Sequence, residues 1–128
     1  FFEKKKKKIS IKSFLMNQKN IAGLGNIYCS EILYDSQISP HRMVSKIKIY
    51  EFKKLVNSIK KILKKAIIKG GTTIKDYNIS DEKVGYFKNR LKVYDREDCN
   101  CMRCKKNYKI KKIFQNGRST FYCVKCQK

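Results

Sequence analysis

Hydrophobic residues recur every three or four positions along residues 49–69, and this spacing predicts the longest helix of the chain. Its apolar face comprises Phe52, Leu55, Val56, Ile59, Ile62, Leu63, Ala66 and Ile67. Lysines fall mostly on the opposite side, and the two glycines at 70 and 71 supply a stop signal. We interpret this helix as scaffold, because a lysine-rich outer face is typical of an ordinary solvated helix.

Two shorter helical patterns precede this long one. In the first, one face comprises Ile11, Phe14, Leu15 and Gln18. The second begins near Ile27, and its apolar side comprises Ile27, Tyr28, Ile32 and Leu33. The second helix should end before Ser39-Pro40, because the residue before a proline is disfavoured in the helical region.

The last third of the chain changes from helical to strand-like patterns. Residues 72–86 have mixed polarity and predict a short element with a loop. Leu91 to Tyr94 alternate like a brief strand. Two further strands are expected near residues 109–114 and 119–123, because Gln115-Asn116-Gly117 between them is a turn signal.

Two Cys-x2-Cys pairs frame this predicted hairpin. Cys101 and Cys104 are followed by eighteen residues and then by Cys123 and Cys126. Structural Zn²⁺ favours four thiolates, and each pair offers two sulfurs from one tight turn. Two disulfides or four unrelated thiols are the alternatives. Cys99 could compete as a ligand, but the symmetry of the two pairs favours Cys101.

The charge of the chain predicts a polyanionic partner. Its 128 residues carry 32 basic against 10 acidic side chains, for a formal net charge of +22. DNA, RNA and an acidic membrane face all fit such a balance. Lysine is the default basic residue here, so the few arginines are more informative. No apolar run is long enough to cross a bilayer and no signal peptide is evident. The zinc pattern then favours a reducing cytoplasm over a disulfide scaffold.

The segment Gly23-Leu24-Gly25-Asn26 precedes a predicted helix and is a candidate anion cradle. Unpaired amides at a helix start attract anions, and glycines let a phosphate approach the backbone. Asn26 either donates its side-chain amide to a phosphate or simply caps the helix. No Lys-Ser/Thr follows the glycines, so a nucleotide-binding P-loop is not supported.

Single residues of chemical interest remain elsewhere. Arg118 lies near the tip of the predicted hairpin, where it either reaches a phosphate or a DNA groove, or is an exposed turn residue. His41 is the only histidine, and we interpret it as structural. Cys29 fits a buried position in the second helix.

Taken together, these stretches resemble the C-terminal half of formamidopyrimidine-DNA glycosylase. The matching segments include residues 11–12, 15–18, 21–28 (Ile-Ala-Gly-Leu-Gly-Asn-Ile-Tyr), 31–33, 38–40, 70–77 (Gly-Gly-Thr-Thr-Ile-Lys-Asp-Tyr), 85–87, 93–94 and 117–123 (Gly-Arg-Ser-Thr-Phe-Tyr-Cys). Endonuclease VIII is a near relative, but residues 117–123 look more like the formamidopyrimidine branch.

The resemblance implies a mainly α fold with a small β zinc hairpin. A helix–two-turn–helix DNA-binding domain would span residues 1–90, and a zinc-finger β-hairpin with four cysteine ligands and one structural Zn²⁺ would span residues 91–128. Asn26 matches a residue that binds DNA phosphate, and Lys7 matches a DNA-contacting lysine. Arg118 matches an arginine that grips phosphate beside the lesion and donates a proton in δ-elimination. Residues 78–85 match the loop over the everted base.

The resemblance also implies a function for a longer parent protein. That parent would be a base-excision-repair DNA glycosylase and AP lyase that removes 8-oxoguanine and formamidopyrimidines from double-stranded damaged DNA. The family's nucleophile is an N-terminal proline amine in an N-terminal lobe, and Phe1-Phe2-Glu3 cannot replace it. We therefore expect this chain to be inactive by itself and dependent on the missing lobe. We also expect it to be monomeric and not membrane-bound.

Two other readings of the sequence stay open. A stand-alone zinc-ribbon module that binds nucleic acid without catalysis explains the charge and the cysteines, but not the glycine-asparagine helix start. A non-catalytic remnant of a decayed gene is the third reading. The interval between the two cysteine pairs is roughly two residues longer than the family pattern, which should lengthen the hairpin without disturbing the sulfurs.

Overall fold

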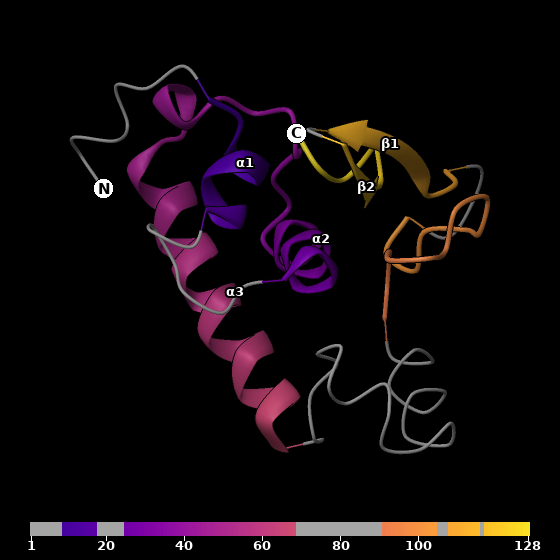
Figure 1. The fold of residues 1–128 in the computed structure, drawn as a ribbon, viewed down its shortest axis with the longest axis horizontal. Helices are drawn as coiled ribbons and strands as arrows, with labels where there is room; N and C mark the ends of the chain where they lie inside the picture. The colour runs from indigo at the N-terminus through magenta and orange to yellow at the C-terminus, as the bar shows by residue number, and fades with distance from the viewer. Residues whose placement is uncertain (1–8, 18–24, 69–90, 105–107, 116) are drawn as a thin grey trace.

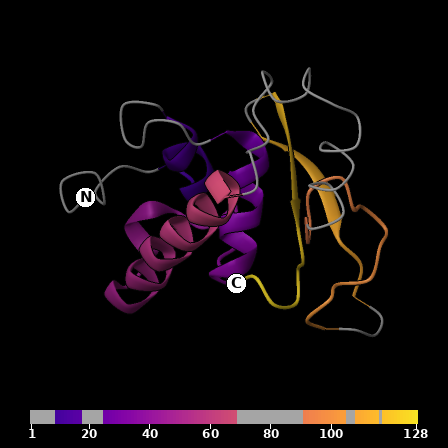
Figure 2. The same ribbon diagram turned by 90° about the horizontal axis from the view of Figure 1, so that it is seen from below.

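The computed structural model describes residues 9–17, 25–68, 91–104, 108–115 and 117–128. In chain order the elements are α1 (Ile11–Met16), α2 (Asn26–Asp35), the 3₁₀ helix η2 (Val44–Lys46), α3 (Ile49–Ile68), β1 (Lys111–Gln115) and β2 (Arg118–Tyr122). Helix α2 lies between α3 on one side and the β1–β2 hairpin on the other (Figures 1 and 2). This confirms the predicted mainly α fold with a small β hairpin.

Helix α1 begins where the sequence supplies a cap. The Ser10 hydroxyl accepts a hydrogen bond from the Ser13 amide at 3.1 Å, which satisfies one of the unpaired donors of the first turn. Ile11, Phe14 and Leu15 are buried as predicted. The fourth residue of the predicted face, Gln18, lies outside the described residues.

Helix α2 is buried on nearly every side. Its buried residues are Tyr28, Cys29, Ser30, Glu31, Ile32, Leu33 and Tyr34. The prediction of a single apolar side was therefore too narrow, because the helix packs against α1 and α3 on one side and against β2 on the other. Ile27 is only half-buried, and the helix ends at Asp35, ahead of Ser39-Pro40 as predicted.

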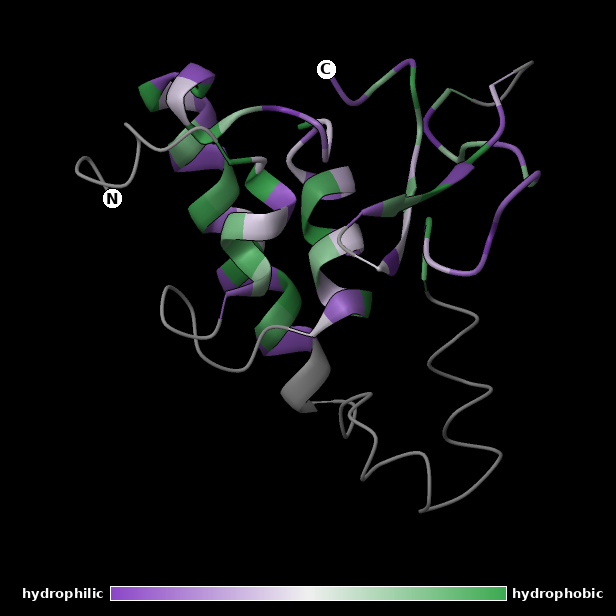
Figure 3. Cartoon of the chain, turned by 45° about the horizontal axis from the view of Figure 1, so that its top comes forward, coloured by the Kyte–Doolittle hydropathy of each residue, from purple (hydrophilic) through white to green (hydrophobic). Residues whose placement is uncertain are grey.

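Two hydrophobic clusters flank this helix. The first is formed by α1, α2, α3 and the segment between α2 and α3, around Ile11, Leu15, Ile32 and Leu55. The second lies under the hairpin and comprises Tyr34, Val93, Cys101, Ile110, Phe121 and Cys123. Tyr34 belongs to α2, so this helix contributes side chains to both clusters. Figure 3 shows the hydrophobic positions, in green, concentrated on the three helices.

Helix α3 confirms the long periodic pattern. Leu55 is buried, and Phe52, Val56, Ile59, Ile62 and Leu63 are half-buried. The predicted lysine face is exposed. Two of these lysines have specific partners: the Lys61 Nζ lies 2.8 Å from Asp35 Oδ1 at the end of α2, and the Lys54 Nζ donates a hydrogen bond to Gln37 Oε1 at 3.1 Å. The two-glycine stop lies outside the described residues.

The segment after residue 90 differs from its prediction. Leu91 to Tyr94 form bends and a turn rather than a strand, although Leu91 and Val93 are buried as the alternation suggested. The reason lies in Glu31 of α2, whose carboxylate accepts hydrogen bonds from the backbone amides of Lys92, Val93 and Tyr94 at 2.8–2.9 Å. Amides gathered around one carboxylate are no longer available to a neighbouring strand.

The hairpin is a two-stranded antiparallel sheet. Its strands pair from Lys111↔Tyr122 to Gln115↔Arg118. Strand β1 begins about two residues later than predicted, and the end of β1 and both ends of β2 lie within one residue of the prediction. Gly117 adopts a φ of +76°, which glycine allows at little strain. Among the described residues, no helix has the length and hydropathy to cross a membrane.

We predict that the buried carboxylate of Glu31 stabilises the packing of residues 91–94 on α2. Glu31→Gln should lower the free energy of unfolding by about 2 kcal/mol, since hydrogen bonds to a charged group contribute that much and a side-chain NH₂ would face backbone donors. Chemical denaturation measures this change. The exposed Glu97→Gln is the control and should stay within about 0.5 kcal/mol. Equal stability of the two variants would contradict the prediction.

Candidate metal centre and nucleic-acid interface

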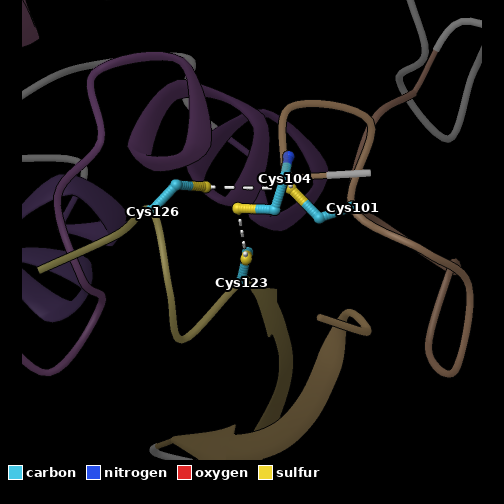
Figure 4. A group of neighbouring side chains, drawn as sticks. All are labelled: Cys101, Cys104, Cys123 and Cys126. Atoms are coloured by element: carbon cyan, nitrogen blue, oxygen red, sulfur yellow. Dashed lines mark hydrogen bonds between the residues drawn. The ribbon is translucent and has the colours of Figure 1, made fainter. Parts of the chain in front are cut away.

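The four paired cysteines converge at one point. Cys101 and Cys104 come from the loop before β1, and Cys123 and Cys126 follow β2 (Figure 4). Their sulfur atoms all lie within 4.8 Å of one another, and among the described residues they form the one group able to hold a metal ion. The Sγ–Sγ distance is 3.8 Å for both Cys101–Cys126 and Cys104–Cys123.

These distances fit a tetrahedral thiolate site. With metal–sulfur bonds of about 2.3 Å, a regular tetrahedron has sulfur–sulfur edges of about 3.8 Å. A disulfide requires about 2.05 Å, and all four thiols are free, so the structure does not adopt the disulfide alternative. Cys99 is exposed and lies outside the group, so the structure places Cys101, and not Cys99, beside the other three sulfurs.

The electrostatics of the group favour a bound cation. Burial works to raise the pKa of Cys101, but hydrogen bonds from the Tyr34 hydroxyl and the amides of Cys104 and Arg103 bring that pKa down to about 6. Burial and then the neighbouring sulfurs raise the pKa of Cys104 and Cys126. Four thiolates so close together repel one another, and a divalent cation removes that repulsion.

The second candidate site is a cleft beside the hairpin. Its volume is about 260 Å³, and its lining residues are Lys12, Ser13, Met16, Asn17, Gln115 and Arg118. Arg118 is exposed at the start of β2, as the tip position predicted. The cleft brings α1 against the end of the hairpin, although these segments are about a hundred residues apart in the sequence.

Lys12 is the other charged residue of this cleft, and the sequence did not single it out. Its side chain is only 2% exposed, and its ammonium donates a hydrogen bond to Thr120 Oγ1 at 2.8 Å. Burial and the nearby Arg118 charge lower the pKa of Lys12, whereas Cys29 acts in the opposite direction. In the sequence Lys12 is one lysine among many. Its burial, which distinguishes it from the others, is visible only in the structure.

Asn26 occupies a different position from the one expected of a cap. Gly25 is the N-cap of α2 and makes no side-chain capping hydrogen bond, and Asn26 is the first helical residue. The Asn26 side-chain amide donates to the Ser119 carbonyl at 2.8 Å, while its buried Oδ1 has no hydrogen-bond partner among the residues that the structure describes. Asn26 thus joins the start of α2 to the residue beside Arg118.

Other candidates are placed more simply. Lys7, the glycine at 23 and the loop of residues 78–85 lie outside the described residues, so their predicted contacts stay predictions. Cys29 is buried, as predicted, and burial raises the pKa of its thiol to about 12. His41 is exposed and packs edge-on against Tyr122, with ring centroids 5.5 Å apart, which agrees with a structural role.

Comparison with known proteins shows which family has this arrangement. The sequence profile described as the "Formamidopyrimidine-DNA glycosylase H2TH domain" matches residues 1–78, which is more than half of the chain. The chain belongs to this H2TH family. The profile match and the four-cysteine group together support the resemblance noted from the sequence, while the boundary at residue 90 stays a prediction.

Relatives of this H2TH-family chain match it over almost its whole length. The formamidopyrimidine-DNA glycosylases of Rickettsia felis and Proteus mirabilis are each 46% identical, over 94% and 98% of this chain but only 43% and 45% of their own lengths. The chain thus spans less than half the length of these curated relatives.

Solved structures show the same correspondence. The Lactococcus lactis Fpg bound to DNA containing an abasic site superposes with a TM-score of 0.85 at 35% identity, covering 99% of this chain and 45% of that one. A complex of MutM with DNA containing carbocyclic 8-oxo-G gives the same TM-score, identity and coverage. The fold of this chain is therefore that of one part of those proteins.

We predict that metal binding depends on Cys101 and not on Cys99. After dialysis, elemental analysis should find about one divalent ion per chain in the unmodified protein and in Cys99→Ser, because Cys99 lies outside the sulfur group. Cys101→Ser should lose most of the metal, since three thiolates form an open site. Equal loss in both variants would show that the ligand set is different.

Proposed function

We propose that this chain is the DNA-binding part of a base-excision-repair DNA glycosylase and AP lyase that removes oxidised purines. The observation that carries the proposal is the cleft where Arg118 and Lys12 meet, with Asn26 holding the start of α2 against the hairpin. Two cations and a helix start whose N-cap residue, Gly25, has no capping side chain lie together on a chain with a net charge of +22. A DNA phosphate fits this arrangement.

Each residue of the interface has a distinct proposed role. The exposed Arg118 guanidinium can give two parallel hydrogen bonds to one phosphate. The Lys12 ammonium donates a hydrogen bond to Thr120 Oγ1, so it would be oriented before DNA arrives. An incoming phosphate would oppose the lowered pKa of Lys12 and favour its charged form. The side-chain amide of Asn26 and the first backbone amides of α2 would add neutral hydrogen-bond donors for the phosphate.

The four-cysteine group supports structural Zn²⁺ as the resident ion. Thiolate ligands and tetrahedral spacing suit Zn²⁺, and four protein ligands leave no open coordination position for catalysis. The ion would crosslink the loop of residues 101–104 to the chain after β2 and so hold the base of the hairpin that carries Arg118. A reducing compartment such as the bacterial cytoplasm would keep these thiols available.

For catalysis we assign a supporting role to this chain. Arg118 would hold the phosphate beside an everted base and donate a proton in the elimination step. Eversion is needed because the glycosidic carbon is inaccessible inside the base stack. The nucleophile would be the N-terminal proline amine of a separate lobe of the same protein. The whole protein would act as a monomer on damaged double-stranded DNA.

A stand-alone zinc-ribbon module for RNA is less well supported. Such a module accounts for the cysteines but gives no role to the Asn26–Ser119 hydrogen bond or to the cleft against α1. Preference for duplex DNA with an abasic site over RNA of the same length separates the two functions.

Arg118→Ala should weaken duplex DNA binding and reduce its salt dependence. Loss of one phosphate contact lowers the slope of log K against log salt by about 0.9. Fluorescence anisotropy at several salt concentrations measures this slope. Lys53→Ala, which removes an exposed charge from α3, is the control and should leave the slope unchanged. Identical binding of Arg118→Ala and the parent at every salt concentration would exclude Arg118 as a contact.

Excision should require the N-terminal lobe. Borohydride trapping on duplex DNA that contains 8-oxoguanine should yield a covalent complex only when the chain is joined to that lobe, because the Schiff base needs its proline amine. The 128-residue chain should bind the same DNA without being trapped, apart from trace reaction of its lysines at abasic sites. Efficient trapping by the chain by itself would place the nucleophile here and refute this division of roles.

A further inference from the structure

The last turn of α2 reaches the metal centre through Tyr34. This side chain is only 1% exposed and belongs to the hydrophobic cluster under the hairpin. Its hydroxyl oxygen lies 3.2 Å from the sulfur of Cys101, which is itself fully buried. A tyrosine hydroxyl at this distance from a buried sulfur is within hydrogen-bonding range.

The surroundings of the hydroxyl decide the direction of this hydrogen bond. The backbone N–H of Arg103 points to the Tyr34 hydroxyl oxygen at 3.3 Å, so that oxygen already accepts a hydrogen bond. A thiolate that binds a metal has no proton to donate. The hydroxyl proton of Tyr34 therefore has the Cys101 sulfur as its acceptor.

Arg103 holds the ring of Tyr34 in place from the other side. Its guanidinium lies 4.3 Å from the ring centroid and donates a hydrogen bond to the Tyr34 carbonyl at 3.0 Å. Arg103 lies between the proposed ligands Cys101 and Cys104. The loop that carries these cysteines therefore contacts the end of α2 in two ways: Tyr34 contacts Cys101, and Arg103 contacts Tyr34. A cation over an aromatic face and near a helix C-terminus is favourable on both counts.

We propose that Tyr34 is a positioning residue of the metal centre, which donates a hydrogen bond to the metal-bound Cys101 thiolate and so ties α2 to the ion. This inference rests on the metal site proposed above. Residues that hydrogen-bond to metal ligands orient them and commonly change metal affinity 10- to 100-fold when removed. Here the same side chain also connects the metal to the helix whose first residue, Asn26, touches the hairpin tip.

The test replaces Zn²⁺ by Co²⁺, whose sulfur-to-metal charge-transfer absorption reports the thiolates directly. Tyr34→Phe keeps the ring and its contact with Arg103 but removes the hydroxyl. Loss of a hydrogen bond raises the energy of the sulfur lone pairs, so the charge-transfer band should shift to longer wavelength. Competition with a chelator should show Zn²⁺ bound about tenfold more weakly. Tyr28→Phe, a buried tyrosine of the same helix in the other cluster, is the control and should match the parent.

A measurement on the unmodified chain covers the case in which Tyr34→Phe fails to fold. In the ¹¹³Cd-substituted protein, the Tyr34 hydroxyl proton should exchange slowly with water and show scalar coupling to cadmium through the hydrogen bond. Unchanged cobalt bands and zinc affinity in folded Tyr34→Phe, or a hydroxyl proton that exchanges as fast as that of an exposed tyrosine, would overturn the inference. Failure of the unmodified chain to bind cobalt would instead overturn the metal site itself.

Discussion

The burial of both sides of α2 is the constraint on which the rest of this structure depends. A helix buried all round must satisfy its polar side chains inside the protein. Glu31 does so with three backbone amides of residues 92–94, and Ser30 and Tyr34 face Phe121 and Cys101. Because these partners all belong to residues 91–128, the helical part and the cysteine-rich part are fixed to one another through this helix.

This arrangement explains how distant segments form one interface. At the start of α2, Asn26 holds the carbonyl of Ser119, and on the neighbouring α1, Lys12 holds Thr120. Arg118 directly precedes these two contact residues in β2. The hairpin tip is therefore positioned by hydrogen bonds at its sides and by the cysteine group at its base, and the arginine projects from a rigid support rather than from a free turn.

The four-cysteine group and the basic cleft are linked by the same helix. Tyr34 at one end of α2 contacts the sulfur of Cys101, and Asn26 at the other end contacts the hairpin beside Arg118. The C-terminal residues add to this link, since Gln127 donates to the Ile38 carbonyl and accepts from the Cys123 amide. Metal binding and the geometry of the basic cleft are thus expected to respond together to changes in this helix.

Local sequence determined the helices, the hairpin and the two cysteine pairs, and tertiary structure decided which groups meet. The periodicity of α3, the Cys-x2-Cys spacing and the turn at Gly117 are local signals, so these features were predictable. The bends at residues 91–94 and the burial of Lys12 were not, because each depends on a partner, Glu31 or Thr120, that is 60 or more residues away. Hydrophobic periodicity shows which single face of a helix is buried. A helix that is buried on two sides, as α2 is, has almost no such pattern.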